Sequence, residues 1–113
     1  MRFAFEDEQL ELAAAVRDLL SREVPAERVR EAWESEDGRL RDVWAKLADM
    51  GVLGLMVPEA HGGLGFSEEE MVLALTECGR VGLPDPVLSS AMVVAPLLAE
   101  VIAQDSAPSG AAP

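Results

Sequence analysis

The sequence is poor in the residues on which many small proteins rely for covalent or aromatic stabilisation. It has one cysteine, one histidine, no tyrosine and 4% aromatic residues among 113. A single cysteine, Cys78, excludes an intrachain disulfide and is typical of a protein kept in a reducing compartment. Because aromatic residues are so few, we expect a core built from Leu, Val, Ala and Met.

Basic residues are also scarce. Nine Lys and Arg stand against 21 Asp and Glu, which gives a formal net charge of −12. Nucleic acids and anionic membrane surfaces both favour clusters of Lys and Arg. We therefore expect neither as a partner, and the acidity is most simply explained by solubility.

Long apolar runs are missing as well. The longest apolar stretch, Ala91–Ala99, is far shorter than the roughly 18 residues of a membrane span. Acidic residues from Glu6 to Glu11 interrupt the beginning of the chain, where a signal peptide needs an apolar run. These absences predict a cytoplasmic protein.

What is present is a helical pattern. Half of the residues are hydrophobic, and the length fits one domain. Apolar residues recur three and four positions apart, which is typical of helices with one buried face. The spacing predicts an all-α fold, an up-down orthogonal bundle of five to six helices, over residues 7–22, 26–34, 40–50, 67–80 and 86–104. The count depends on Pro96, which should kink the last helix or break it into two.

Local signals mark the ends of several of these helices. Gly51 stands where a left-handed residue closes the third helix. Ser67 and Glu70 have the spacing of a capping box at the start of the fourth. Residues 105–113 are small and proline-rich, and we expect a linker or tail after a domain that spans residues 1–104.

The two last helices carry more apolar residues than one buried stripe requires. On the fourth, we expect Met71, Val72, Leu75 and Cys78 to face inward. From the fourth helix onward the surplus consists of Leu83, Val87, Leu88, Met92, Val93 and Leu97. An isolated domain would expose this surplus as an apolar patch, which predicts a partner surface.

Few residues offer chemistry. His61 has no second histidine, and with no cysteine nearby it forms neither a metal set nor a catalytic triad; a solvent-facing or structural role is favoured over acid–base catalysis. The Gly62-Gly63-Leu64-Gly65 segment favours a sharp connection between helices, and a phosphate cradle is the alternative. We expect Cys78 to be buried and unreactive. We expect the methionines to fill gaps in the core; the alternative is that they line the wall of a pocket for an apolar ligand.

The linear order of several motifs is more informative than any single residue. Phe3-x-Phe5-x-x-Glu8-Gln9 opens the first helix, and Trp44-x-x-Leu47-x-x-Met50-Gly51-Val52-Leu53-Gly54-Leu55 follows. Val57-Pro58-Glu59-x-His61-Gly62-Gly63-x-Gly65 comes next, before a helix with Glu77, Gly79 and Arg80. This order, over about residues 3–104, resembles the N-terminal helical domain of the flavin-dependent acyl-CoA dehydrogenases. Glu6 replaces the Ser or Thr that usually caps the first helix in that family.

The resemblance implies an oxidoreductase that uses FAD to dehydrogenate an acyl-CoA thioester between its α and β carbons. It implies that the flavin and the catalytic glutamate lie in a middle domain and a C-terminal domain, and that the whole protein forms a homo- or hetero-oligomer. We therefore expect no catalytic residue and no metal ligand in this chain, which would be inactive and free of FAD on its own. Leu88, Met92 and Val93 are the residues that we expect to line the acyl pocket.

A second interpretation remains open. The chain could be a stand-alone, non-catalytic helical interaction module, or an accessory subunit that completes another polypeptide. Both interpretations use the same apolar surplus on the last helices, and both predict that it is covered by a partner.

Overall fold

The computed structural model describes residues 5–105, and all regular structure in that range is helical. The five α-helices are α1 (Asp7–Glu23), α2 (Ala26–Glu34), α3 (Arg41–Asp49), α4 (Glu68–Val81) and α5 (Ala95–Asp105). Short 3-10 helices lie at η1 (Val52–Gly54) and η2 (Glu59–His61), and a π-helix, η3 (Leu88–Val94), leads directly into α5. The predicted all-α class and helix number are confirmed, whereas residues 106–113 of the predicted tail lie outside the described range.

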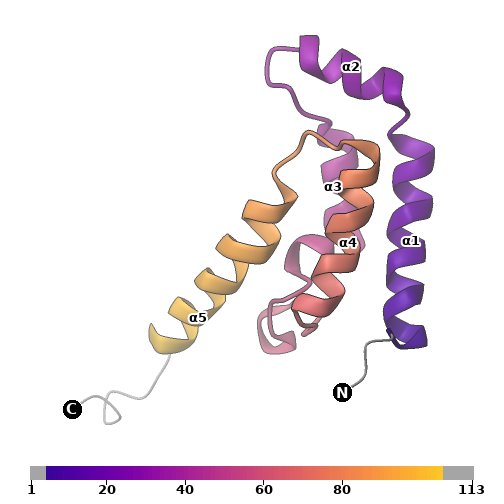
Figure 1. Ribbon diagram of the computed structural model, residues 1–113. Helices are drawn as coiled ribbons and strands as arrows, with labels where there is room; N and C mark the ends of the chain where they lie inside the picture. Colours follow the sequence, from indigo (N-terminus) through magenta and orange to yellow (C-terminus); the bar gives the residue numbers. More distant parts are fainter. Residues whose placement is uncertain (1–4, 106–113) are drawn as a thin grey trace.

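Three helices lie side by side and form the body of the bundle (Figure 1). α1 and α4 run in the same direction, with α3 alongside them, while α2 crosses one end and η3–α5 leans away from the other helices. The core cluster contains Val16, Leu20, Val43, Leu47, Val52, Leu55 and Met71, all fully buried. The predicted aliphatic core is thus confirmed, and the methionines Met50, Met56 and Met92 pack partly buried against it.

The helix ends follow the local signals in the sequence. Gly51 adopts a left-handed conformation with φ of 87° after α3, and Ser67 and Glu70 form the predicted capping box of α4. Glu6 caps α1 although it is not Ser or Thr, because Gln9 accepts a hydrogen bond from the Glu6 backbone N–H at 2.8 Å. The departure at Glu6 therefore leaves the start of the helix intact.

Pro96 does not break the last helix, contrary to one of the two expected outcomes. Proline has no N–H to donate to Met92 four residues earlier, and its ring would collide with that carbonyl group in a regular α-helix. The chain widens upstream instead, and the Ala95 N–H donates five residues back to Ser90. A π-helical stretch absorbs the proline while the helix continues.

The predicted inner face of α4 is partly wrong. Val72 on α4 is exposed, and Ala74 and Glu77 are buried in its place. Leu10 on α1 and Trp33 on α2 are exposed too, although their spacing fits the apolar stripes. Val87, predicted among the surplus, is buried. The helical period was correct in each case, but which side of a broad apolar face is covered depends on the neighbouring helix.

Candidate functional site: an uncovered apolar helix

The last helix exposes a continuous apolar surface. From η3 into α5 the exposed large apolar side chains are Leu88, Val93, Val94, Leu97, Leu98, Val101 and Ile102. Figure 1 shows that this helix stands apart from the other four, and along η3 and α5 only Ala91 and Ala99 are buried. Removing one such side chain from water stabilises a protein by roughly 1.5–3 kcal/mol. An exposed surface of this extent is typical of an interaction or ligand-binding face.

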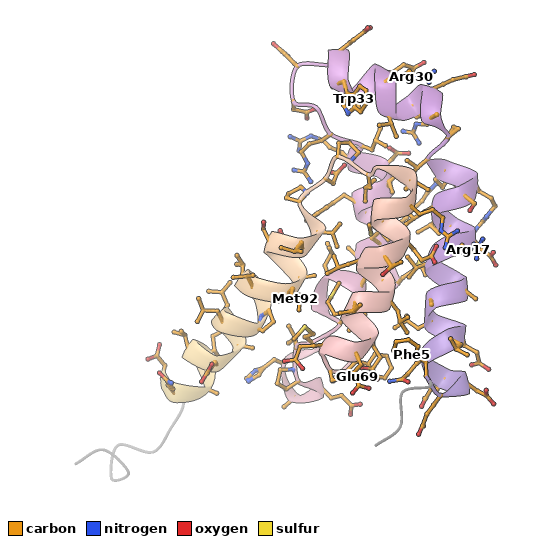
Figure 2. All side chains as sticks on the ribbon, viewed as in Figure 1. Phe5, Arg17, Arg30, Trp33, Glu69 and Met92 are labelled. Carbon is orange, nitrogen blue, oxygen red and sulfur yellow. The ribbon has the colours of Figure 1, made fainter. Side chains whose placement is uncertain are left out.

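The three predicted pocket residues divide into two groups. Leu88 and Val93 are exposed on η3, five residues apart and therefore about one π-helical turn from each other. Met92 turns toward the bundle and packs, partly buried, against the core (Figure 2). Leu88 and Val93 belong to the uncovered surface, whereas Met92 lies against the core.

The same helix is long and apolar enough to meet a length-and-composition criterion for a membrane span. Its mean hydropathy is 1.3 over the 18 residues Leu88–Asp105. The sequence-based count considered only an uninterrupted apolar run and therefore missed it. One such helix is weak evidence for a span, and it contains the acidic residues Glu100 and Asp105.

The glycine-rich loop is a connection, as expected. The backbone N–H groups of Gly62, Gly63, Leu64, Gly65 and Phe66 donate to backbone carbonyls between Gly54 and Glu59, at 2.9–3.2 Å. Gly63 also packs directly on Val57, where a Cβ atom would collide with the backbone. Because these amides are already bonded within the loop, they do not provide the free donors that a phosphate cradle needs.

The titratable candidates also behave as the sequence suggested. His61 lies exposed at the end of η2. Cys78 is buried, and this burial raises the pKa of its thiol to about 11. Within residues 5–105, no group of three or more His, Cys, Asp or Glu is placed to hold a metal ion.

A small hollow that the sequence did not reveal lies between α2 and the end of α4. Its volume is about 320 Å³, and its lining includes Val29, Arg30, Trp33 and Arg80. Trp33 is 70% exposed, so its ring borders this hollow without entering the core. Nε of Arg80 also forms an ion pair with Oε2 of the buried Glu77 at 3.1 Å. Both residues belong to the motif of Glu77, Gly79 and Arg80. The lining comes from α2 and from residues 79–82, which are far apart in the sequence.

Over residues 5–105 the fold is an all-helical bundle whose last helix exposes most of its large apolar side chains. The family model for the acyl-CoA dehydrogenase N-terminal domain matches residues 6–106, and the chain belongs to this family.

Individual relatives agree with this assignment. The acyl-CoA dehydrogenase IpdE2 of Mycolicibacterium smegmatis is 32% identical over 88 residues, which cover 77% of this chain and 28% of that protein. A chain in the crystal structure of the ChsE4-ChsE5 complex from Mycobacterium tuberculosis superposes with a TM-score of 0.79 at 31% identity, covering 88% of this chain and 28% of that chain. The chain thus spans about 28% of the length of these relatives.

Proposed function

We propose that this chain acts as the N-terminal part of an FAD-dependent acyl-CoA dehydrogenase, which oxidises an acyl-CoA thioester between its α and β carbons. Its match to the family's N-terminal domain model and its similarity to about 28% of the length of two longer relatives support this proposal. The observation that carries the proposal is the uncovered apolar surface of η3–α5. In a complete enzyme this surface would contact the remaining domains and, near Leu88 and Val93, the acyl chain.

The contribution of such a surface to the chemistry is physical rather than catalytic. An aliphatic wall excludes water from the reacting thioester, and charges and hydrogen bonds act more strongly where water is absent. No described residue combines a nucleophile or base with the positioned partner that catalysis requires. The amides of the glycine-rich loop donate to backbone carbonyls within the loop, so they offer no free donors to a phosphate of the flavin cofactor.

Two variants test the domain contact. Leu97→Lys places a charge in the exposed apolar surface, and Ser89→Lys places the same charge at an exposed polar position of η3. Circular dichroism of the 113-residue chain should be unchanged for both, because neither side chain is buried. In the complete enzyme, Leu97→Lys should reduce flavin retention and acyl-CoA-dependent dye reduction at least tenfold, whereas Ser89→Lys should not. Equal activity of the two variants would rule out this surface as a domain contact.

A second pair tests the acyl wall. Val93→Trp adds bulk at the proposed pocket position, and Val101→Trp adds the same bulk further along the exposed helix. We expect only Val93→Trp to raise KM, and to raise it more for long acyl chains than for short ones. An unchanged KM across chain lengths would remove Val93 from the proposed pocket while leaving the domain contact standing.

The alternative of an accessory subunit has one observation in its favour, the similarity to a chain from a two-component complex. If the chain acts this way, it should bind a separately expressed partner polypeptide through α5 and restore that partner's activity. Light scattering of the mixture distinguishes this outcome from a covalently continuous enzyme. Leu97→Lys should abolish the mixed complex.

A further inference from the structure

A buried carboxylate lies in the link that joins α4 to the last helix. The side chain of Asp85 has 0% exposure and stands between Pro84 and Pro86, whose rings restrict the backbone of the link. It belongs neither to the uncovered apolar surface nor to the hollow beside Trp33. Its place at the root of η3 makes it the clearest buried charge without an assigned role.

Both oxygens of this carboxylate are bonded to the loop between α2 and α3. Oδ1 accepts a hydrogen bond from the backbone N–H of Leu40 at 2.9 Å, and Oδ2 accepts one from Nε of Arg39 at 3.0 Å. The guanidinium of Arg39 in turn lies over the ring of Trp44 on α3, with its central carbon 4.8 Å from the ring centroid. The root of the last helix is thereby tied to a separate part of the bundle in a specific geometry.

The remainder of that helix is held weakly. Its only buried side chains, Ala91 and Ala99, are small and contribute little apolar area. Its contacts with the rest of the bundle are mainly with η1 and α4. A helix that is attached firmly at one end and lightly along its length takes its direction from the attached end.

A carboxylate is an expensive way to fill a buried site, because it must lose its hydration. An aliphatic side chain would seal the same position without that cost but would impose no direction. Two hydrogen bonds, of which the one from Arg39 is also an ion pair, define both the position and the orientation of the link. The chemistry at Asp85 therefore suits alignment better than simple stabilisation.

We propose that Asp85, held by Arg39 and the Leu40 amide, is a positioning residue that sets the direction in which η3–α5 leaves the bundle. Its importance for an acyl pocket rests on the proposed function, because that function needs Leu88 and Val93 at a defined place. The alignment itself does not depend on any substrate. It is therefore open to test on the chain alone.

The test is a distance measurement between spin labels by pulsed electron paramagnetic resonance. Labels at Arg17→Cys on α1 and Gln104→Cys on α5, in a Cys78→Ala background, report the direction of the last helix. Labels at Arg17→Cys and Ala48→Cys on α3 report the core. We expect Asp85→Asn to broaden or shift the first distance distribution and to leave the second unchanged.

Asp37→Asn is the matched control. Asp37 pairs with Arg41, the first residue of α3, at 2.7 Å, and both side chains are exposed. Its Oδ1 also accepts a hydrogen bond from the backbone N–H of Arg39 at 3.1 Å, which the amide oxygen of an asparagine can still accept. Neither distribution should change in Asp37→Asn. If Asp85→Asn gave an α1–α5 distribution that superposes on that of the parent chain, the positioning role would be wrong.

A variant of Arg39, the ion-pair partner of Asp85, keeps the test decisive if Asp85→Asn fails to fold. Arg39→Gln changes a side chain that is still 27% exposed, and it removes the ion pair while leaving the Leu40 hydrogen bond. We expect a smaller broadening of the same α1–α5 distribution, and an unchanged distribution would again contradict the proposal. Because no measurement here uses flavin or acyl-CoA, a negative result leaves the proposed function to be judged by its own variants.

Discussion

Gln9 and Glu70 join the first turns of two parallel helices across 61 positions of sequence. Nε2 of Gln9 donates to Oε1 of Glu70 at 3.1 Å. Each residue is also the third residue of its own helix in a capping box, Gln9 in α1 and Glu70 in α4. The same two side chains therefore complete two helix ends and set the register between α1 and α4.

This arrangement predicts a pH-dependent contribution of Glu70 to stability. Hydrogen bonds from Ser67, and then from Gln9, lower the pKa of the Glu70 carboxyl from 4.5 to about 2. A lowered folded-state pKa means that the stabilisation is complete above about pH 4.5 and is lost as the pH falls toward 2. At pH 7, Glu70→Ala should lower the free energy of unfolding by about 1 kcal/mol.

Urea denaturation at pH 7 and pH 3 measures this difference. Glu68→Ala is the control, because Glu68 is in the same first turn and makes no described side-chain hydrogen bond. The difference in the free energy of unfolding between Glu70→Ala and Glu68→Ala should be smaller at pH 3 than at pH 7. A gap that is independent of pH would show that Glu70 does not act through its ionised carboxylate.

The burial pattern of α1 predicts unequal effects for two leucines on that helix. Leu20 is fully buried in the core, whereas Leu10 is exposed. Leu20→Ala should lower the free energy of unfolding by about 2–5 kcal/mol, because it removes buried methyl groups and leaves a cavity. Leu10→Ala should change it by less than about 0.5 kcal/mol. Thermal or urea denaturation checks both, and similar losses would contradict the assigned face of α1.

Two glycines should respond in opposite directions to alanine. At Gly63 a Cβ atom would collide with the carbonyl oxygen of Val57, so Gly63→Ala should destabilise the chain by about 1–3 kcal/mol. Gly79 lies within α4 with open space around it, so Gly79→Ala should stabilise the chain by about 0.5–1 kcal/mol. Urea midpoints measure both effects. A neutral Gly63→Ala would mean that the loop does not hold Val57 against Gly63 in solution.

The thiol of Cys78 should be unreactive in the folded chain. Desolvation by burial, aided by the nearby charge of Glu77, raises its pKa to about 11. At pH 8 roughly one thiol in a thousand would be ionised, and the thiolate is the reactive form. Labelling with a disulfide reagent should therefore be slow in buffer and fast in urea. Thr76→Cys in a Cys78→Ala background, exposed on the same helix, should react quickly in both.

Local features of the fold could be predicted from the sequence because they depend on neighbouring residues. The bounds of α2, the left-handed Gly51 and the Ser67–Glu70 capping box all involve groups within a few positions of each other. Hydrogen-bonding distance and φ preference at such sites are properties of short segments. Of the apolar surplus predicted from Leu83 to Leu97, the exposed members Leu88, Val93 and Leu97 also identified the helix that is uncovered.

Long-range choices could not be predicted in the same way. The periodicity of α4 fitted Val72 on its inner face as well as Ala74, and only packing against α1 decided between them. The role of Asp85 was invisible, because its partners Arg39 and Leu40 lie 46 and 45 positions earlier. No periodic pattern marks a single buried carboxylate.

By itself, the sequence determined the helical class, the helix ends and the family resemblance, since these arise from local propensity, spacing and motif order. The tertiary structure decided which apolar faces are covered, how Pro96 is accommodated by a π-helical stretch, and where the last helix points. The reason is that burial is a property of pairs of distant segments. An apolar side chain is stabilised by burial, but only the arrangement of the other helices determines whether this chain buries it.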